Sequence, residues 1–224
     1  MSSRSQATRQ RLIVAARELL LEQGLAVSLS EVAERAGVTR MTLYRHFGPR
    51  RDLLLEVLLT EVTEVATACR QLLDDPAGSL TVRAHSAMTY LAVEFASAPL
   101  VTSILVGSTM TDLEELDPNG SVRNLITDTA GSFLDAAHAA GLLRGTIDSS
   151  VAWIGRQVLA MAYQLPGEHR DPQVIADEVA RHFLPSILRI TDAECEALIG
   201  HPPPASPSTP GGDVRERAAV ADLN

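Results

Sequence analysis

Apolar side chains recur every three or four residues along most of this chain, and glycine or proline interrupts the pattern about once per helix length. Runs of alternating β-branched residues, which would indicate half-buried strands, do not occur. We therefore expect an all-α protein. The predicted helices cover residues 7–23, 29–36, 40–47, 50–73, 79–97, 99–106, 121–140, 150–164 and 172–190.

The second and third of these helices are short and have clear boundary signals. Ser28 and Glu31 form the capping-box pattern, in which each side chain bonds the backbone amide of the other residue. Gly37 supplies the stop for this helix, and the Thr39 hydroxyl can cap the next one. Pro49 suits the first position of the fourth helix, which we expect to run from about Arg50 to Leu73.

Two short helices joined by a tight glycine turn, with a longer helix on either side, predict a helix-turn-helix module. Leu43 and Phe47 are four residues apart and form the inner side of the third helix. Its outer side is polar and carries Arg40, Thr42, Tyr44, Arg45 and His46.

The major groove of DNA admits one α-helix, and there arginine can bond guanine while threonine contacts thymine or phosphate. We expect residues 39–47 to enter such a groove, with Tyr44 and His46 placed on backbone phosphates. Arg50, at the start of the fourth helix, is expected to hold a further phosphate. The alternative for each residue taken alone is a solvated face, with Tyr44 engaged in ordinary packing.

Charge is distributed unevenly between this N-terminal part and the rest of the chain. Residues 1–51 hold nine Arg and four Glu, a net charge of +5. The remaining 173 residues hold ten Arg and 24 acidic residues, a net charge of −14, so that the whole chain carries −9. All 19 basic residues are Arg, which suits bidentate contacts to phosphate and guanine. A small basic head ahead of an acidic body is compatible with a nucleic-acid partner.

Residues 7–58 resemble the DNA-binding domain of TetR-family transcriptional regulators, above all through SLSEVAERAGVTRMTLYRHFGPRRDLLLEVL at 28–58. The resemblance implies a homodimer in which three N-terminal helices bind operator DNA and a larger helical domain binds an inducer and dimerises. It places Thr39, Arg40, Thr42, Tyr44 and His46 on the recognition helix, after a helix capped by Ser28. Pro49 and Arg50 depart from the Ser or Asn and the Lys that are common there in the family.

The helix expected over 150–164 is apolar nearly all round, and the helix over 172–190 has a broad apolar side. Such helices must be covered on more than one side. We expect them to form a four-helix interface with a second copy of the chain. The residues assigned to this interface are Val151, Ile154, Val158, Val179, Phe183 and Ile187. The alternative is that they belong to an ordinary core within one chain.

A small-molecule pocket is expected among the middle helices, where a few polar side chains occur with aromatic and thioether groups. The candidate ligand-binding residues are His85, Met88, Thr89, Phe133, Trp153, Gln157 and Met161, with Phe95, Met110 and Tyr163 as further candidates. Each of them also fits an ordinary core. Because only 4% of the chain is aromatic, we expect a mainly aliphatic pocket and an apolar or amphipathic ligand.

Other classes of protein find little support. Glu178 and His182 are four residues apart, but no third zinc ligand is evident, and neither a phosphate loop nor a dinucleotide fingerprint occurs. We therefore expect no enzyme activity, no metal and no cofactor. The chain shows neither a membrane-spanning stretch nor a secretion signal, and its two cysteines form no disulfide framework, so a cytoplasmic protein is expected.

The expected organisation is a helix-turn-helix domain over 1–49, a ligand-binding and dimerisation domain over 50–192, and a disordered proline-rich tail over 193–224. The predicted function is a ligand-responsive transcriptional regulator, a repressor, that binds a palindromic operator as a homodimer. Its expected partners are double-stranded operator DNA, a small-molecule effector and a second copy. The alternatives are an all-α ligand-binding or interaction protein without operator binding, and a small enzyme of unrecognised type.

Overall fold

The computed structural model describes residues 3–96, 98, 100–101, 117–162 and 171–204, and this part of the chain is helical apart from one isolated β-bridge between Leu143 and Leu188. The all-α fold expected from the sequence is therefore confirmed. Within these ranges, none of the helices combines the length and the hydropathy that a membrane crossing requires.

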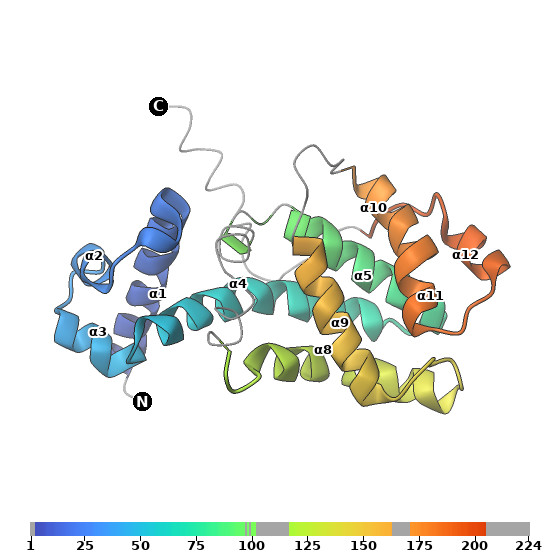
Figure 1. Cartoon of the computed structure of the whole chain (residues 1–224), viewed down its shortest axis with the longest axis horizontal. Coiled ribbons are helices and arrows are strands. Elements are labelled where there is room, and N and C mark those ends of the chain that lie inside the picture. Colours follow the sequence, from blue (N-terminus) through green and yellow to red (C-terminus); the bar gives the residue numbers. More distant parts are fainter. Residues whose placement is uncertain (1–2, 97, 99, 102–116, 163–170, 205–224) are drawn as a thin grey trace.

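A compact head is formed by α1 (Ser3–Gln23), the short 3-10 turn η1 (Gly24–Ala26), α2 (Leu29–Arg35) and α3 (Arg40–Phe47) (Figure 1). The capping box between Ser28 and Glu31 is present, and the Thr39 hydroxyl accepts the Thr42 amide at the start of α3, as predicted. Gly37 has φ +65°, the left-handed conformation that a helix stop requires. Local signals thus define the turn between α2 and α3.

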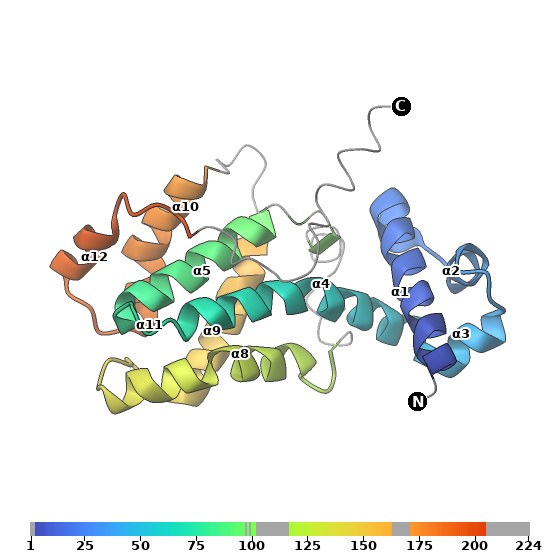
Figure 2. The ribbon, with the colours of Figure 1, turned by 180° about the vertical axis from the view of Figure 1, so that it is seen from behind.

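The long helix α4 (Arg50–Leu73) connects the head to the body, and it runs between α5 and α8 (Figure 2). Its 24 residues give a length of about 36 Å. The other described elements of the body are α5 (Leu80–Ala96), α8 (Ser121–Ala139), α9 (Ile147–Ala162), α10 (Pro172–Glu178), the π-helical turn η2 (Val179–Phe183), α11 (Leu184–Ile187) and α12 (Asp192–Leu198).

The helix expected over 172–190 ends at Ile187 and contains the π-helical turn η2 in its middle. Pro185 is the second residue after this turn. Proline has no amide hydrogen and its ring crowds the carbonyl four residues earlier, so a regular α-helical ladder cannot pass through it. The wider turn accommodates this interruption, and it is a feature that the apolar periodicity did not predict.

The fourth helix spans the residues expected, with Pro49 as its N-cap rather than its first residue. Two other boundaries differ from those expected. The α9 helix starts at Ile147, and the Thr146 hydroxyl accepts the Ser149 amide at 3.1 Å, so that neither Asp148 nor Ser149 is the cap. The helix α12 extends the ordered body beyond residue 192.

The segment expected to be a tail from residue 193 thus begins with a packed helix. A capping box between Thr191 and Glu194 starts α12, which buries Cys195 and Leu198 against the body. The proline-rich run that motivated the expectation begins only at Pro202. Residues 205–224 and most of the helix expected over 99–106 lie outside the described part, in which Leu100 and Val101 are helical and buried.

Candidate nucleic-acid interface and apolar cavity

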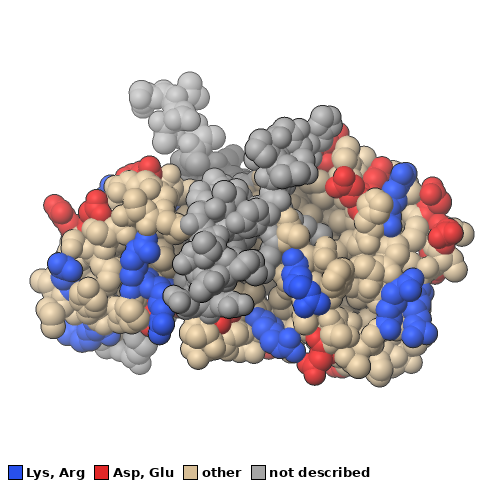
Figure 3. Space-filling view, in the orientation of Figure 1, with Lys and Arg blue, Asp and Glu red and all other residues tan. Residues whose placement is uncertain are grey.

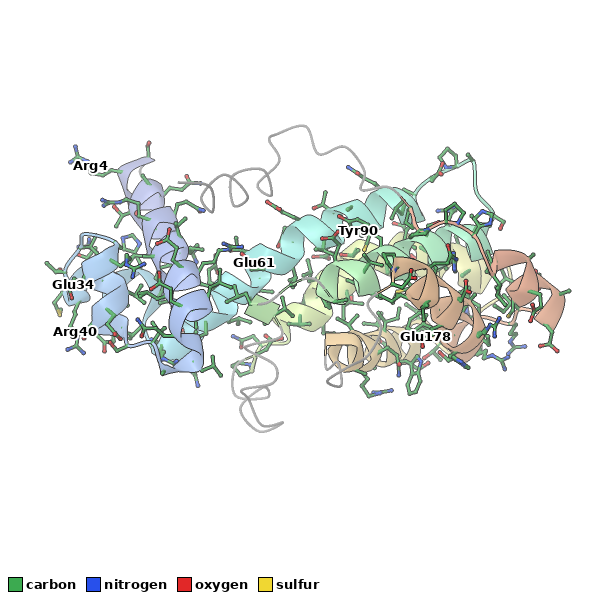
Figure 4. The ribbon with its side chains drawn as sticks, turned by 90° about the horizontal axis from the view of Figure 1, so that it is seen from above. Arg4, Glu34, Arg40, Glu61, Tyr90 and Glu178 are labelled. Carbon is green, nitrogen blue, oxygen red and sulfur yellow. The ribbon has the colours of Figure 1, made fainter. Side chains whose placement is uncertain are left out.

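The outward face of α3 is an exposed cationic surface of the head. Met41 is 77% exposed and Tyr44 42% exposed, and Arg40 and Arg45 are also exposed. Figure 4 shows Arg40 at the end of the head that lies farthest from the body. On the opposite side of α3, Leu43 and Phe47 are buried against α1 and α4, as predicted.

Pairing divides the arginines of the head into two groups. Arg9 bonds Glu56 and Arg17 bonds Glu61, so that α1 is joined to α4, whereas Arg35 bonds Glu22 at 3.0 Å. The hydrogen bond from Arg35 lowers the pKa of Glu22 below its ordinary value. Among the described residues, Arg40 and Arg45 have no carboxylate within ion-pair distance, and the same holds for Arg4 and Arg11 on α1. The charge of the α3 face is therefore uncompensated in the free protein, as an anionic partner would require.

The polar groups at the start of α3 and α2 are already engaged. The Thr39 and Thr42 hydroxyls lie 3.0 Å apart and share a hydrogen bond, and the Ser28 hydroxyl donates to the Glu31 carboxylate at 2.6 Å. His46 is half-buried, with its ring centroid 6.4 Å from that of Phe47. Direct contacts with a partner are thus left mainly to the longer side chains of the face.

Arg50 has a structural role that was not predicted. Its Nε donates to the Val27 carbonyl oxygen at 3.1 Å, and its Nη2 donates to the Leu25 carbonyl oxygen. These carbonyls lie in the connection between α1 and α2, so Arg50 ties the start of α4 to that connection. The phosphate contact expected of Arg50 stays a prediction.

The body contains an apolar cavity of about 150 Å³ enclosed by α4, α5, α8, α9 and the η2–α11 segment. A stripe from Leu58 to Leu73 along α4 lines it, over about 22 Å of helix. Space is left where small side chains meet, and these are Ala66, Cys69, Ala84, Ala87 and Ala130. No sequence pattern indicated this convergence, because the small residues come from three separate helices.

The described lining of this cavity offers no free hydrogen-bond donor. The Thr129 hydroxyl donates to the Leu125 carbonyl at 2.7 Å, and the Cys69 thiol donates to the Ala87 carbonyl at 3.5 Å. Burial raises the pKa of Cys69 to about 12, so this thiol is neutral. A bound molecule would gain mainly contacts with carbon atoms there, and among these two groups only the Thr129 oxygen could still accept a hydrogen bond from it.

Only part of the predicted ligand set faces this cavity. Met88 and Phe133 line it, and so does Phe95. Gln157 is half-buried in α9 outside the lining. The Met161 side chain, Met110 and Tyr163 lie outside the described residues. The other three predicted residues, His85, Thr89 and Trp153, do not line the cavity.

His85 and Thr89 lie in the contact between α5 and α10 rather than at the cavity. His85 is 2% exposed, and its Nε2 lies 3.0 Å from the Ala176 carbonyl oxygen. Burial lowers the pKa of His85, which favours the neutral ring. Thr89 is fully buried one turn later, and its hydroxyl has no hydrogen-bond partner. Neither lines the cavity, so both fit the core alternative rather than the predicted ligand set.

The residues assigned to a dimer interface are largely interior residues of a single chain. Val151 and Val179 are each 3% exposed, and Ile154, Val158, Phe183 and Ile187 line the cavity. The cover that α9 requires is supplied by α5 and α8. The core alternative therefore accounts for these positions, of which Val158 is only half-buried.

The outer side of α9 and α11 remains exposed instead. Trp153 is 36% exposed, and its indole N–H donates to the Ser186 hydroxyl at 2.8 Å. The guanidinium of Arg156 lies 5.3 Å from the centroid of the indole ring. These three side chains border an open depression of about 290 Å³. Trp153, predicted as a ligand residue, is therefore a surface residue away from the apolar cavity.

The cavity and the core of the head share part of their wall. Leu58, Phe95 and Val101 line the cavity and also belong to the hydrophobic cluster that contains Leu43 and Phe47 of α3. A molecule in the cavity would thus touch side chains that are packed continuously with the helix-turn-helix core. Figure 3 shows acidic side chains near α10 and α12, while arginines are spread over both the head and the body. In the described residues, no cluster of three His, Cys, Asp or Glu side chains is placed to hold a metal.

Residues 12–57 match the model of the family described as bacterial regulatory proteins, tetR family. The HTH-type transcriptional activator FasR of Mycolicibacterium smegmatis is 38% identical over 66 residues, which are 29% of this chain and 30% of that protein. The HTH-type transcriptional regulator AlkX of Mycobacterium tuberculosis is 32% identical over 109 residues, 48% of this chain and 52% of that protein. The chain thus spans about half or less of the length of these relatives.

Solved structures share the fold over nearly the whole length. RolR in complex with resorcinol superimposes with a TM-score of 0.66 at 20% identity, covering 92% of this chain and all of that one. NalD, the secondary repressor of the MexAB-OprM multidrug efflux pump in Pseudomonas aeruginosa, gives a TM-score of 0.58 at 22% identity, covering 85% of this chain and all of that one. The helical body, for which the sequence offered only helix number and order, therefore has the same architecture as theirs.

Proposed function

We propose that this chain, which belongs to the tetR family of bacterial regulatory proteins, is a ligand-responsive transcriptional repressor that acts in the cytoplasm. The observation that carries the proposal is the uncompensated face of α3, where Arg40 and Arg45 lack carboxylate partners while Arg9, Arg17 and Arg35 are paired. A face of this kind on the second helix of a helix-turn-helix suits the major groove of DNA.

The DNA target would be a palindromic operator read by a homodimer. Two recognition helices related by a two-fold axis meet successive major grooves about 34 Å apart. The subunits would associate through the outer side of α9 and α11, where Trp153 and Ser186 are exposed. This surface replaces the interior residues first assigned to the interface.

The effector would occupy the apolar cavity. A cavity of about 150 Å³ lined by carbon atoms matches the size at which an engineered apolar cavity in another protein binds benzene. A carboxylate placed there would lose water and find no free donor in the described lining, at a cost of several kcal/mol, and a hydroxyl would find only the Thr129 oxygen as an acceptor. We therefore propose a hydrocarbon-like effector, in contrast to the diphenol resorcinol held by the structural neighbour RolR.

The side chains shared by the cavity wall and the head core would couple effector binding to release from the operator. The effector can change DNA affinity only if it binds one arrangement of the two heads better than the other. Leu58, on α4, is in contact with both the cavity and the head core, so displacing it would move α4 and change the spacing of the heads.

The DNA-binding proposal is tested by selecting duplexes from a random-sequence library and measuring gel shifts on the selected duplex. Arg40→Ala and Tyr44→Ala should each weaken binding at least tenfold while the dimer stays intact in sedimentation. Arg181→Ala, which removes the same charge from an exposed site in the body, serves as the matched control. Equal binding by wild type and both α3 variants would refute the assignment.

The effector proposal is tested by thermal shift with toluene, resorcinol and benzoate as probes. Toluene should stabilise the wild type, whereas the two polar probes should not. Ala130→Leu fills the cavity and should abolish the toluene shift, while Ala136→Leu, on the exposed side of α8, should preserve it. A preserved shift in a folded Ala130→Leu protein, or stabilisation by benzoate alone, would contradict the proposed site.

A further inference from the structure

Met41 is the most exposed large apolar side chain among the described residues, at 77%, and it lies in the middle of the cationic face of α3. At 100° per residue, Arg40, Tyr44, Met41 and Arg45 follow one another around the helix over an arc of about 140°. The next side chains on either side, Thr42 and Phe47, are half-buried and buried. Met41 is therefore held toward whatever α3 meets, and its exposure serves no packing within the chain.

The neighbouring side chains can supply the polar contacts of this face, so Met41 must contribute a different kind of contact. The hydroxyls of Thr39 and Thr42 bond each other, and the Thr39 hydroxyl also accepts the Thr42 amide. The guanidinium groups of Arg40 and Arg45 are free to bond phosphates or guanine. Met41 can do neither, since a thioether donates no hydrogen bond and accepts only weakly. What it can add to an interface is apolar contact.

The major groove of B-DNA presents one apolar group at the base edges, the C5 methyl of thymine. We propose that Met41 reads a thymine methyl group in each half-site and so acts as a specificity-determining residue. This inference rests on the proposed function, and it names the base feature that the face recognises. The flexible, unbranched side chain suits the task, because it can adjust to a methyl group without fixed geometry.

Two consequences follow for the operator. Each half-site carries one position at which thymine is preferred over cytosine because of its methyl group. A duplex with 5-methylcytosine at that position presents a methyl group at the same ring carbon, so it should recover part of the lost affinity. A face that read bases only through arginine and guanine would show neither effect.

The test is a double-mutant cycle between protein and DNA. Each thymine of the selected duplex is replaced in turn by deoxyuridine, which removes only the methyl group, and affinity is measured for wild type and Met41→Ala. Loss of one buried methyl group should cost wild type about fourfold in affinity per half-site. The Met41→Ala protein should bind the unmodified duplex more weakly by a similar factor and show no further loss at that one position.

Val14→Ala is the matched control, because Val14 is an exposed apolar residue on α1, outside this face. It should keep the full deoxyuridine effect. If wild type binds the duplex but no thymine position couples to Met41, the inference fails while the proposed function stands. If Met41→Ala loses nothing on any duplex, Met41 has no role in DNA reading and its exposure serves another partner. If no duplex is selected at all, the proposed function itself fails.

Discussion

The Nε of Arg50 donates to the carbonyl oxygen of Val27 at 3.1 Å, which ties the first turn of α4 to the residue that precedes the cap of α2. The same guanidinium also bonds the Leu25 carbonyl. Arg50→Ala should therefore destabilise the protein by about 2–4 kcal/mol, because two hydrogen bonds from a charged group are lost. Urea unfolding at constant pH measures this.

Arg51→Ala is the control for that experiment. Arg51 is the adjacent residue, it is 57% exposed, and it pairs only with its neighbour Asp52. Its replacement should change the free energy of unfolding by less than about 0.5 kcal/mol. If both variants unfold like wild type and Arg50→Ala merely lowers the salt dependence of DNA binding, Arg50 is a phosphate contact and not a brace.

His85 predicts a loss of stability in mild acid. Burial lowers its pKa in the folded protein, whereas the unfolded chain should titrate near 6.5. Below that pH the unfolded state binds the extra proton, so the contribution of His85 is complete above about pH 6.5 and falls as pH decreases, by up to about 1.4 kcal/mol per pH unit.

Urea midpoints between pH 5 and 8 should show this fall for wild type and a shallower one for His85→Gln, whose amide can still donate to the Ala176 carbonyl. His138→Gln, at an exposed site on α8, should keep the wild-type profile. Identical profiles for wild type and His85→Gln would show that His85 is not the group responsible.

Cys69 should resist alkylation in the native protein. Its pKa is raised by burial to about 12, so that at pH 8 only about one thiol in 10⁴ is ionised. Iodoacetamide should modify it on the order of a thousandfold more slowly than an ordinary exposed cysteine. Peptide mass spectrometry after timed labelling reports both cysteines, and rapid labelling of Cys69 without denaturant would show that the cavity wall opens.

Trp153 should be important for self-association. Trp153→Glu places a charge on the outer side of α9 and removes the bond to Ser186, and it should weaken dimerisation at least tenfold in sedimentation equilibrium. Leu21→Glu, an equivalent change on the exposed side of α1, should leave the dimer unaffected. A dimer that survives Trp153→Glu unchanged would place the interface elsewhere.

The head could be predicted closely from the sequence because its signals are local. Ser28 and Glu31, and the pair Thr39 and Thr42, lie three residues apart, and each pair forms the bonds expected. The bonds of Arg50 to the Val27 and Leu25 carbonyls were not predicted, for the opposite reason. Its partners are 23 and 25 residues away, so nothing near it in the sequence indicates a brace.

In the body, apolar periodicity predicts which side of a helix is buried, but not which chain covers it. The apolar sides of α9 and the 172–187 segment correctly indicated burial, but not whether the cover comes from the same chain. Val151 and Phe183 were therefore assigned to a partner although α5 and α8 already enclose that side. The cavity depends on Ala66, Ala87 and Ala130 meeting in space, which requires the packing of three helices and not a motif.

The most direct test of the central claim is a fluorescence-anisotropy titration of the library-selected duplex and of a scrambled duplex, each over a series of NaCl concentrations. The account predicts that wild type binds the selected duplex at least about 10³-fold more tightly, with affinity that falls linearly in log salt. The Arg40→Ala and Arg45→Ala double variant should lose that preference and have a smaller salt slope. Equal affinity of wild type for both duplexes would contradict a sequence-reading role for α3.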